Sequence, residues 1–236
     1  MTSWPRSPAR IRAMAPSSFA PAEDALAKAV ARGVRQYVII GAGLDSFAVR
    51  RPEFARDVDV FEVDHPATQE LKLERLREAG IDPATAAHYV AADLGVEALD
   101  AALARSPFHP GATAFFSWLG VTAYLTREAN LQTLGAIASC GAPGSELVFT
   151  YIDQRDFDAP ADEERRRVRE LFAAVGEPWV SGFDPASLAE DLRSVGLTLV
   201  EDLGRDEQRE RYCSGRDDGL SPSVADHIAH ARVAET

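Results

Sequence analysis

Cysteine is scarce in this sequence, with only Cys140 and Cys213 among 236 residues. Two cysteines cannot build a disulfide framework, so we expect a protein of a reducing compartment, with the cytoplasm as the default location. Long hydrophobic runs are missing too. No stretch approaches the roughly 18 consecutive apolar residues that a membrane-spanning helix needs, so we expect no membrane partner.

Positive charge is also in deficit, because 25 Lys and Arg residues stand against 37 Asp and Glu residues and leave a net charge of −12. That balance argues against a broad basic face for nucleic acid or anionic lipid, and it favours a small molecule as the partner. The composition is otherwise that of a globular protein, with 46% hydrophobic and 26% charged residues. The length suits one large α/β domain with a well-buried core.

The N-terminal stretch differs from the rest of the chain. Its first 22 residues carry Arg6, Arg10 and Arg12 among Ser, Pro and Ala, without one acidic residue. We expect residues 1–20 to be a flexible segment, with an organelle transit peptide as the alternative. Residues 21–236 are assigned to a single domain.

Short apolar runs alternate with amphipathic stretches along that domain. The run 37–40, closed by glycines, is typical of a strand buried on both faces of a parallel sheet. Further strands are expected at 58–63, 88–91, 113–117, 146–151 and 197–200. Helices are expected at 21–32, 66–79, 96–104, 126–139, around the charged run 162–167, and from an N-cap at Asp184 to Ser194. The repeated order of strand and helix predicts a doubly wound sheet.

In such a sheet, ligands bind beyond the carboxyl ends of the strands. The first strand ends in Gly41-Ala42-Gly43-Leu44-Asp45, and glycines there permit a tight turn and a close approach to a ligand. Asp64 ends the second strand 21 residues after Gly43. At that spacing a carboxylate accepts hydrogen bonds from the ribose of an adenosine-containing cofactor. The alternative role for Asp64 is to cap the helix that begins at Pro66.

The third position of a dinucleotide-binding glycine motif is Ser46 here, which disfavours a pyrophosphate and hence an NAD-linked oxidoreductase. S-adenosylmethionine carries adenosine without phosphate, and its cationic sulfonium suits acids and aromatic rings. Such side chains lie at the predicted strand ends: Asp45, Glu62, Asp64, Asp93, Trp118 and Tyr124. Asp93 has an alternative role as the N-cap of the helix expected from Val96, and Trp118 as a core residue.

Taken in order, the segments 38–45, 60–66, 93–94 and 116–126 resemble the leucine carboxyl methyltransferase family, and more narrowly its bacterial branch of S-adenosylmethionine-dependent methyltransferases. The similarity runs from about residue 34 to residue 220. It implies a class I methyltransferase (Rossmann-like) fold, a doubly wound, mainly parallel seven-stranded sheet whose last strand is antiparallel. Residues 208–213 are our candidate for the remaining strand.

The resemblance also implies a cofactor site. Gly41 would lie against the methionine part, Asp64 would hold the ribose, and Asp93 with Leu94 would bracket the adenine. The full cofactor-binding set that we predict is Gly41, Ala42, Gly43, Asp45, Glu62, Asp64, Asp93, Leu94 and Trp118. The family pattern departs at Leu119, where a Glu that contacts the methionyl group is expected, and in residues 16–19, which hold no Arg for the methionine carboxylate.

We therefore expect an S-adenosylmethionine-dependent O-methyltransferase that methylates a carboxylate or hydroxyl of a small molecule. Tyr124, Tyr212 and Arg216 are candidates for the acceptor pocket, and no residue is assigned as catalytic. We expect no metal, because His227 and His230 lack a nearby third ligand. The alternative is a non-catalytic cofactor-binding or partner-binding protein on the same fold, suggested by Leu119 and the short N-terminal segment. The acceptor and the oligomeric state stay open.

Overall fold

The computed structural model describes residues 16–158, 163–174, 176, 178–214, 222 and 226–235. Of the features expected above, residues 1–15 and Arg216 lie outside the described residues. Residues 16–20, expected in the flexible segment, belong to the first helix, α2, which spans Pro16–Ala31. No helix in the described part of the chain has both the length and the apolar character that crossing a bilayer requires.

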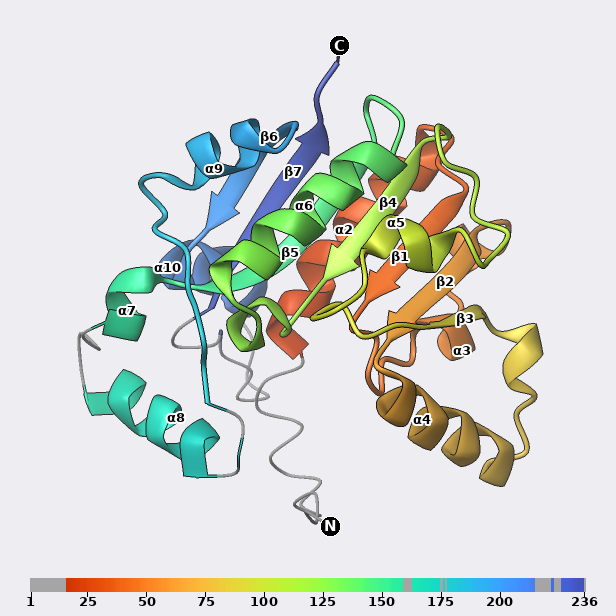
Figure 1. Cartoon of the computed structure of the whole chain (residues 1–236), viewed down its shortest axis with the longest axis horizontal. Coiled ribbons are helices and arrows are strands. Elements are labelled where there is room, and N and C mark those ends of the chain that lie inside the picture. The colour runs from red at the N-terminus through yellow and green to blue at the C-terminus, as the bar shows by residue number, and fades with distance from the viewer. Residues whose placement is uncertain are drawn as a thin grey trace.

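A seven-stranded sheet with the order β3-β2-β1-β4-β5-β7-β6 forms the centre of the molecule (Figure 1). Its strands are β1 (Gln36–Ile40), β2 (Asp59–Asp64), β3 (His88–Ala91), β4 (Ala114–Trp118), β5 (Glu146–Ile152), β6 (Leu197–Leu203) and β7 (Asp226–Val233). The first five strands pair in parallel, and β7 runs antiparallel to both β5 and β6. The predicted sheet, mainly parallel with an antiparallel last strand, is confirmed.

Helices cover both faces of this sheet. Besides α2, they are α3 (Phe47–Arg50), α4 (Pro66–Glu78), α5 (Leu99–Leu103), α6 (Arg127–Cys140), α7 (Gln154–Asp158), α8 (Glu163–Ala174), α9 (Leu188–Ser194) and α10 (Arg205–Gln208). The described residues also form the short helical turns η1 (Glu53–Ala55), η2 (Pro83–Thr85), η3 (Thr122–Tyr124) and η4 (Arg209–Cys213). In Figure 1, α5, α6 and α9 lie in front of the sheet and α2 lies behind it.

Alternation along the strands divides the interior into two cores. In β1, Val38 and Ile40 pack on the α5–α6–α9 face, whereas Tyr37 and Ile39 pack on the α2 face. All five residues of β1 are buried because both faces are covered. This is why the strand reads in the sequence as an uninterrupted apolar run.

The expectation of a strand at residues 208–213 was wrong. Those residues end α10 and form η4, and the seventh strand is Asp226–Val233. The side-chain amide of Gln208, which is 1% exposed, donates to the carbonyls of Leu203 at 2.9 Å and Asp226 at 2.8 Å. Gln208 thus connects the ends of β6 and β7 from a helical position, a role that does not require a strand.

The helix expected from Asp184 starts later, at Leu188, with Ser187 as its N-cap residue. The Asp184 carboxylate accepts a hydrogen bond from the Ala186 amide at 3.0 Å, so it closes the turn that precedes the helix. Of the charged run 162–167, residues 163–167 are helical as predicted, and Asp162 lies outside the described residues. Arg166 and Glu163 are paired at 2.9 Å in α8.

Candidate active site

The carboxyl ends of β1 and β2 lie side by side, because the two strands pair in parallel with Ile40 opposite Val63. The chain then turns at Gly41, whose amide donates to the Val63 carbonyl at 2.8 Å. Next, the amide of Gly43 donates to Asp64 Oδ2 at 2.6 Å. This bond joins the glycine turn of one strand directly to the acid that ends the next strand.

The turn requires glycine at both positions. Gly41 has φ = +67° and Gly43 has φ = +50°, a region that residues with a side chain rarely adopt. A Cβ at position 41 would also overlap the side chain of Val121. The backbone of the turn therefore carries no side chain at positions 41 and 43, at the edge of the sheet where ligands of such folds bind.

Asp64 does not cap the following helix. The N-cap of α4 is His65, whose ring nitrogen Nδ1 accepts from the Ala67 amide at 3.3 Å. The second carboxylate oxygen of Asp64 accepts from the amide of His65 at 2.7 Å. Burial raises the pKa of Asp64, and the Gly43 and His65 amides oppose that rise. Since a carboxylate accepts about four hydrogen bonds, Asp64 keeps capacity for two donors from a ligand.

A buried lysine that was not predicted from the sequence lies beneath these acids. Lys72 of α4 is 4% exposed, and its Nζ lies 2.5 Å from Oε2 of Glu62, which is 1% exposed. Burial raises the pKa of Asp45, Glu62 and Asp64, and the charge of Lys72 opposes the rise at all three. One buried cation thus compensates a group of three carboxylates.

Glu62 lies inside the protein and does not open onto the strand end. Its Oε1 and the hydroxyl of Tyr89, which is opposite it in the β2–β3 register, are both buried without a hydrogen-bond partner among the described residues. Burial, followed by the negative charge of Glu62, raises the pKa of Tyr89 to about 12. Glu62 is the counter-ion of Lys72. Its buried position does not favour a direct contact with a cofactor.

Asp93 and Leu94 follow β3, next to the first two strand ends. Asp93 Oδ1 accepts from the Gly95 amide at 2.9 Å, and its Oδ2 lies 4.0 Å from His65 Nε2. The next helix, α5, begins at Leu99 with Ala98 as its N-cap residue, so Asp93 does not cap it. The structure thus brings Asp93 beside His65, the neighbour of Asp64 in the sequence.

Asp45 and Trp118 both have local structural roles. Asp45 Oδ1 accepts from the Phe47 amide at 2.6 Å and thereby shapes the turn into α3. The indole of Trp118 is 0% exposed within the α5–α6–α9 core, and its Nε1 has no partner among the described residues. The alternative reading of Trp118 as a core residue is therefore the better supported one.

The two described acceptor candidates, Tyr124 and Tyr212, belong to different parts of the structure. Tyr124 lies in η3, directly after β4 and against β5. Tyr212 lies in η4, packs on the α2 face and lines a pocket that does not include Tyr124. This pocket is therefore not one that the two tyrosines share.

The described residues contain no group of three or more His, Cys, Asp and Glu side chains placed to hold a metal ion. His230 Nε2 lies 2.7 Å from Glu146 Oε2, and His227 Nδ1 lies 3.3 Å from Asp202 Oδ1. The two histidines are thus paired with different carboxylates.

With this geometry established, comparison with known proteins identifies the family. The model of the leucine carboxyl methyltransferase family matches residues 3–138, which is more than half of the chain. The chain belongs to this family. The resemblance inferred from the strand-end motifs is confirmed.

Relatives with similar sequences carry names that refer to S-adenosyl-L-methionine. YktD of Bacillus subtilis (strain 168), named as an inferred S-adenosyl-L-methionine-dependent methyltransferase, is 39% identical over 200 residues, which are 84% of this chain and 66% of YktD. A protein of Mycobacterium avium (strain 104) with the same kind of name is 35% identical over 70% of this chain and 52% of its own length. The chain therefore spans between half and two thirds of these relatives.

Solved structures show the same fold at low sequence identity. An O-methyltransferase family protein from Burkholderia thailandensis superposes with a TM-score of 0.60 at 12% identity, over 92% of this chain and 56% of that one. Magnesium protoporphyrin IX methyltransferase (ChlM) from Synechocystis, solved with bound SAH, gives 0.59 at 10% identity, over 98% and 90%. The class I methyltransferase fold predicted from the sequence is confirmed.

The leucine carboxyl methyltransferase match contains the whole strand-end site. Gly41, Asp64, Asp93 and Leu119 all lie within residues 3–138, whereas Tyr212 lies beyond them. Leu119, which stands where the family pattern leads us to expect Glu, is partly buried against the α2-side core.

Proposed function

We propose that this protein binds S-adenosyl-L-methionine at the carboxyl ends of β1–β4 and transfers the methyl group to a carboxylate or hydroxyl oxygen of a small molecule. The hydrogen bond of 2.6 Å between the Gly43 amide and Asp64 carries the proposal. It holds the glycine turn next to Asp64, a carboxylate that can still accept hydrogen bonds from a ligand. The chain also belongs to the leucine carboxyl methyltransferase family.

The residues present fit such a cofactor. Asp64 has two free acceptor positions for the two ribose hydroxyls, and Asp93, whose side chain is about half exposed at 48%, can accept from the adenine amino group. Leu94, partly buried on the core, would lie against the adenine ring. The turn at Gly41 would lie against the methionine part, and a side chain at position 41 would collide with Val121.

The bound cofactor supplies an electrophilic methyl group on a sulfonium. The protein has to align the acceptor oxygen with that methyl group and exclude water, because the displacement is in line. A carboxylate acceptor needs no general base, which agrees with a site in which no base has been identified. Tyr124 lies directly after β4 and is our candidate to border the acceptor.

Calorimetric titration with S-adenosyl-L-methionine tests the proposal. Wild-type protein should bind it more tightly than NAD. The variant Asp64→Asn should bind it roughly 10- to 150-fold more weakly, the equivalent of a lost charged hydrogen-bond acceptor worth about 1.5–3 kcal/mol. Asp59→Asn is the matched control, because Asp59 is exposed at the opposite end of β2. No heat from folded wild-type protein, or equal affinity in the Asp64 variant, would overturn the proposed site.

A second candidate is a cofactor-binding protein without methyl transfer. Leu119 favours it, because an apolar side chain there cannot make the polar contact that the resemblance implies for Glu. Release of S-adenosylhomocysteine in the presence of a panel of small carboxylic acids and phenols separates the two. Binding without release across the panel supports the non-catalytic protein, and release with any acceptor eliminates it.

A further inference from the structure

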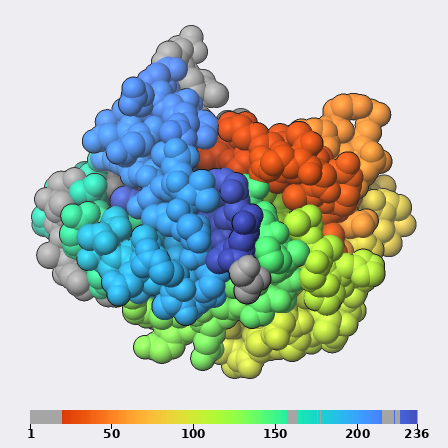
Figure 2. Space-filling model, turned by 90° about the horizontal axis from the view of Figure 1, so that it is seen from above, coloured from red at the N-terminus to blue at the C-terminus, as the bar shows by residue number. Residues whose placement is uncertain are grey.

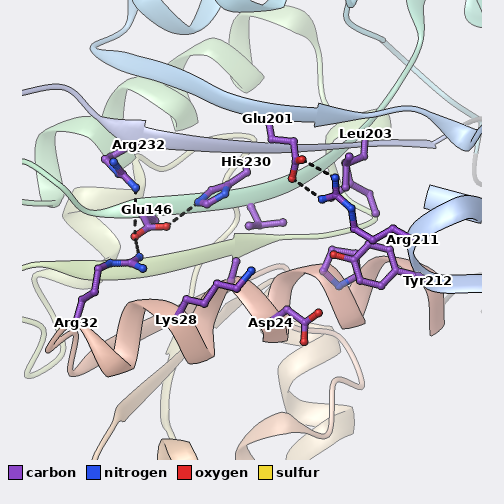
Figure 3. Close-up of a pocket in the computed structure, with 14 residues that line it drawn as sticks. Asp24, Lys28, Arg32, Glu146, Glu201, Leu203, Arg211, Tyr212, His230 and Arg232 are labelled. Atoms are coloured by element: carbon purple, nitrogen blue, oxygen red, sulfur yellow. Dashed lines mark hydrogen bonds and ion pairs between the residues drawn. The ribbon is translucent and has the colours of Figure 1, made fainter. Parts of the chain in front are cut away.

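A second concave site lies on the α2 face of the sheet, and the proposed function makes no use of it. A cavity of about 130 Å³ opens between α2 and the strands β5, β7 and β6, with η4 at one end (Figure 3). Figure 2, seen from above, shows the N-terminal part of the described chain beside its C-terminal part. Glu146, at the start of β5, borders the cavity, so that end lies at the opposite edge of the sheet from Gly41 and Asp64.

Basic side chains gather around this cavity, although the whole protein carries a net charge of −12. Four permanent cations line it: Lys28, Arg32, Arg211 and Arg232, together with His230. The acids that line it are Asp24, Glu146 and Glu201, one fewer than the cations. We call this site the basic pocket. It has a surplus of at least one positive charge, which an anion would neutralise.

At one end of the basic pocket, the carboxylate of Glu146 is shared by Arg32, His230 and Arg232. Glu146 is almost completely buried, with 4% of its side chain exposed, and it contacts Arg32 directly. His230 Nε2 lies 2.7 Å from Oε2 of Glu146, and Arg232 Nη2 lies 3.9 Å from Oε1, the oxygen that Arg32 contacts. Burial acts to raise the pKa of Glu146, but His230 and then Arg32 lower it below the ordinary value. The one negative charge of Glu146 cannot balance both arginines, so Arg232 retains binding capacity.

At the other end, the charges are matched. Arg211 and Glu201 form two parallel hydrogen bonds, each of 2.8 Å, and so neutralise one another. Between the two ends lies Lys28 of α2. It is exposed, and its ammonium makes no hydrogen bond or ion pair with any described residue (Figure 3). Within the basic pocket, Lys28 and Arg232 are thus the two cations without a close carboxylate of their own among the described residues. The charge of Lys28 acts at longer range on Glu201, and Asp24 is the remaining acid of the lining.

The wall formed by the sheet is apolar. Val148, Leu203 and Ile228, each no more than 5% exposed, line the basic pocket between its charged groups. The volume is well below the roughly 300–1,000 Å³ of pockets for drug-sized ligands, so it suits a molecule of few atoms. A short apolar chain would lie on these side chains, while a charged head would reach the cations.

We propose that the basic pocket binds a small organic anion whose carboxylate or phosphate group is held by Lys28 and Arg232 and whose apolar part lies on Val148 and Ile228. Arginine and lysine recognise both kinds of oxyanion through charge-assisted hydrogen bonds. The site is separate from the strand-end site, and the proposal stands whether or not the protein transfers methyl groups.

Calorimetric titration of the whole protein with inorganic phosphate and with butyrate tests this inference. Ionic strength is held constant with chloride, because exposed charges are screened by salt. We expect saturable binding of at least one of the two probes, with phosphate alone indicating a phosphate ester and butyrate alone a carboxylic acid. We expect the ring resonances of His230 to shift on binding, and those of His65 to stay unchanged.

The variants Lys28→Gln and Arg232→Gln should each weaken that binding at least about tenfold, since each removes a charge-assisted contact. Both side chains are exposed, so the fold should survive, and an unchanged melting temperature checks this. Arg193→Gln is the matched control, because Arg193 is exposed on α9, on the other face of the sheet. Absence of saturable binding of either probe up to about 50 mM would overturn the proposal, as would wild-type affinity in Lys28→Gln.

Discussion

Replacing Lys72 by Met tests how strongly the buried cation beneath the strand-end acids supports the fold. Methionine keeps most of the length and apolar stem of lysine, so the substitution removes the charge with little loss of packing. Glu62, at 1% exposure and 2.5 Å from the lost ammonium, is then left buried without its counter-ion. Breaking a buried pair from one side costs about 3–5 kcal/mol of stability.

Protonation of Glu62 limits that cost. A glutamate has a pKa of about 4.3 in the unfolded chain, so binding a proton at pH 7 costs about 3.7 kcal/mol and at pH 5 about 1 kcal/mol. In the variant the folded-state pKa of Glu62 is raised above the unfolded value, so the destabilisation grows above about pH 4.3 and fades as the pH falls toward it. Lys72→Met should therefore lose about 3–4 kcal/mol at pH 7 and about 1 kcal/mol at pH 5.

Urea unfolding of wild type and variant at the two pH values measures this difference directly, from the midpoints and slopes. The double variant Glu62→Gln with Lys72→Met should regain most of the lost stability at pH 7, because no buried charge remains. Lys28→Met is the control, since Lys28 is exposed and should change stability by less than about 0.5 kcal/mol. Equal destabilisation at pH 5 and pH 7 would refute the reasoning, and so would a loss below about 1 kcal/mol at pH 7.

Two further predictions concern other buried groups. Trp118→Phe should destabilise the protein by about 1–3 kcal/mol in urea unfolding, because the smaller ring leaves a cavity in the core. The affinity for S-adenosyl-L-methionine should stay within about twofold of that of the wild type. A large loss of affinity would instead support a cation–π contact. Glu146→Gln should lower stability by about 1.5–3 kcal/mol at pH 7. Because the folded-state pKa of Glu146 is lowered, its contribution is present above about pH 4.3 and is lost at lower pH, so melting temperatures of variant and wild type should converge in acid; a constant difference would contradict this.

The placement of the strand-end residues was predictable because its signals are local. A buried parallel strand is marked by its own apolar run, and the residues that end it follow directly in the sequence, as Gly41 follows β1. Asp64 was found in the same way at the end of β2. Parallel pairing then places consecutive strand ends together without further information.

Lys72 and β7 were not predicted, because their signals are tertiary. A lysine on a helix is ordinarily exposed, and Lys72 is buried only because Glu62 lies next to it on β2. The presence of Glu62 within an apolar strand was the available signal, since a buried carboxylate requires a partner. In β7, His230 and Arg232 face the basic pocket and interrupt the apolar run, so the segment does not look like a strand.

The position of β7 in the sheet has a consequence for how this chain folds. β7 lies between β5 and β6, so β6 has no other strand beside it in the described sheet, although it precedes β7 in the sequence. During synthesis, β1–β5 can assemble as soon as they leave the ribosome, but β6 must wait for the last strand before it gains a backbone partner. A chain cut before Asp226 would therefore lose two strands, and the exposed edge of β5 would be free to pair with another molecule.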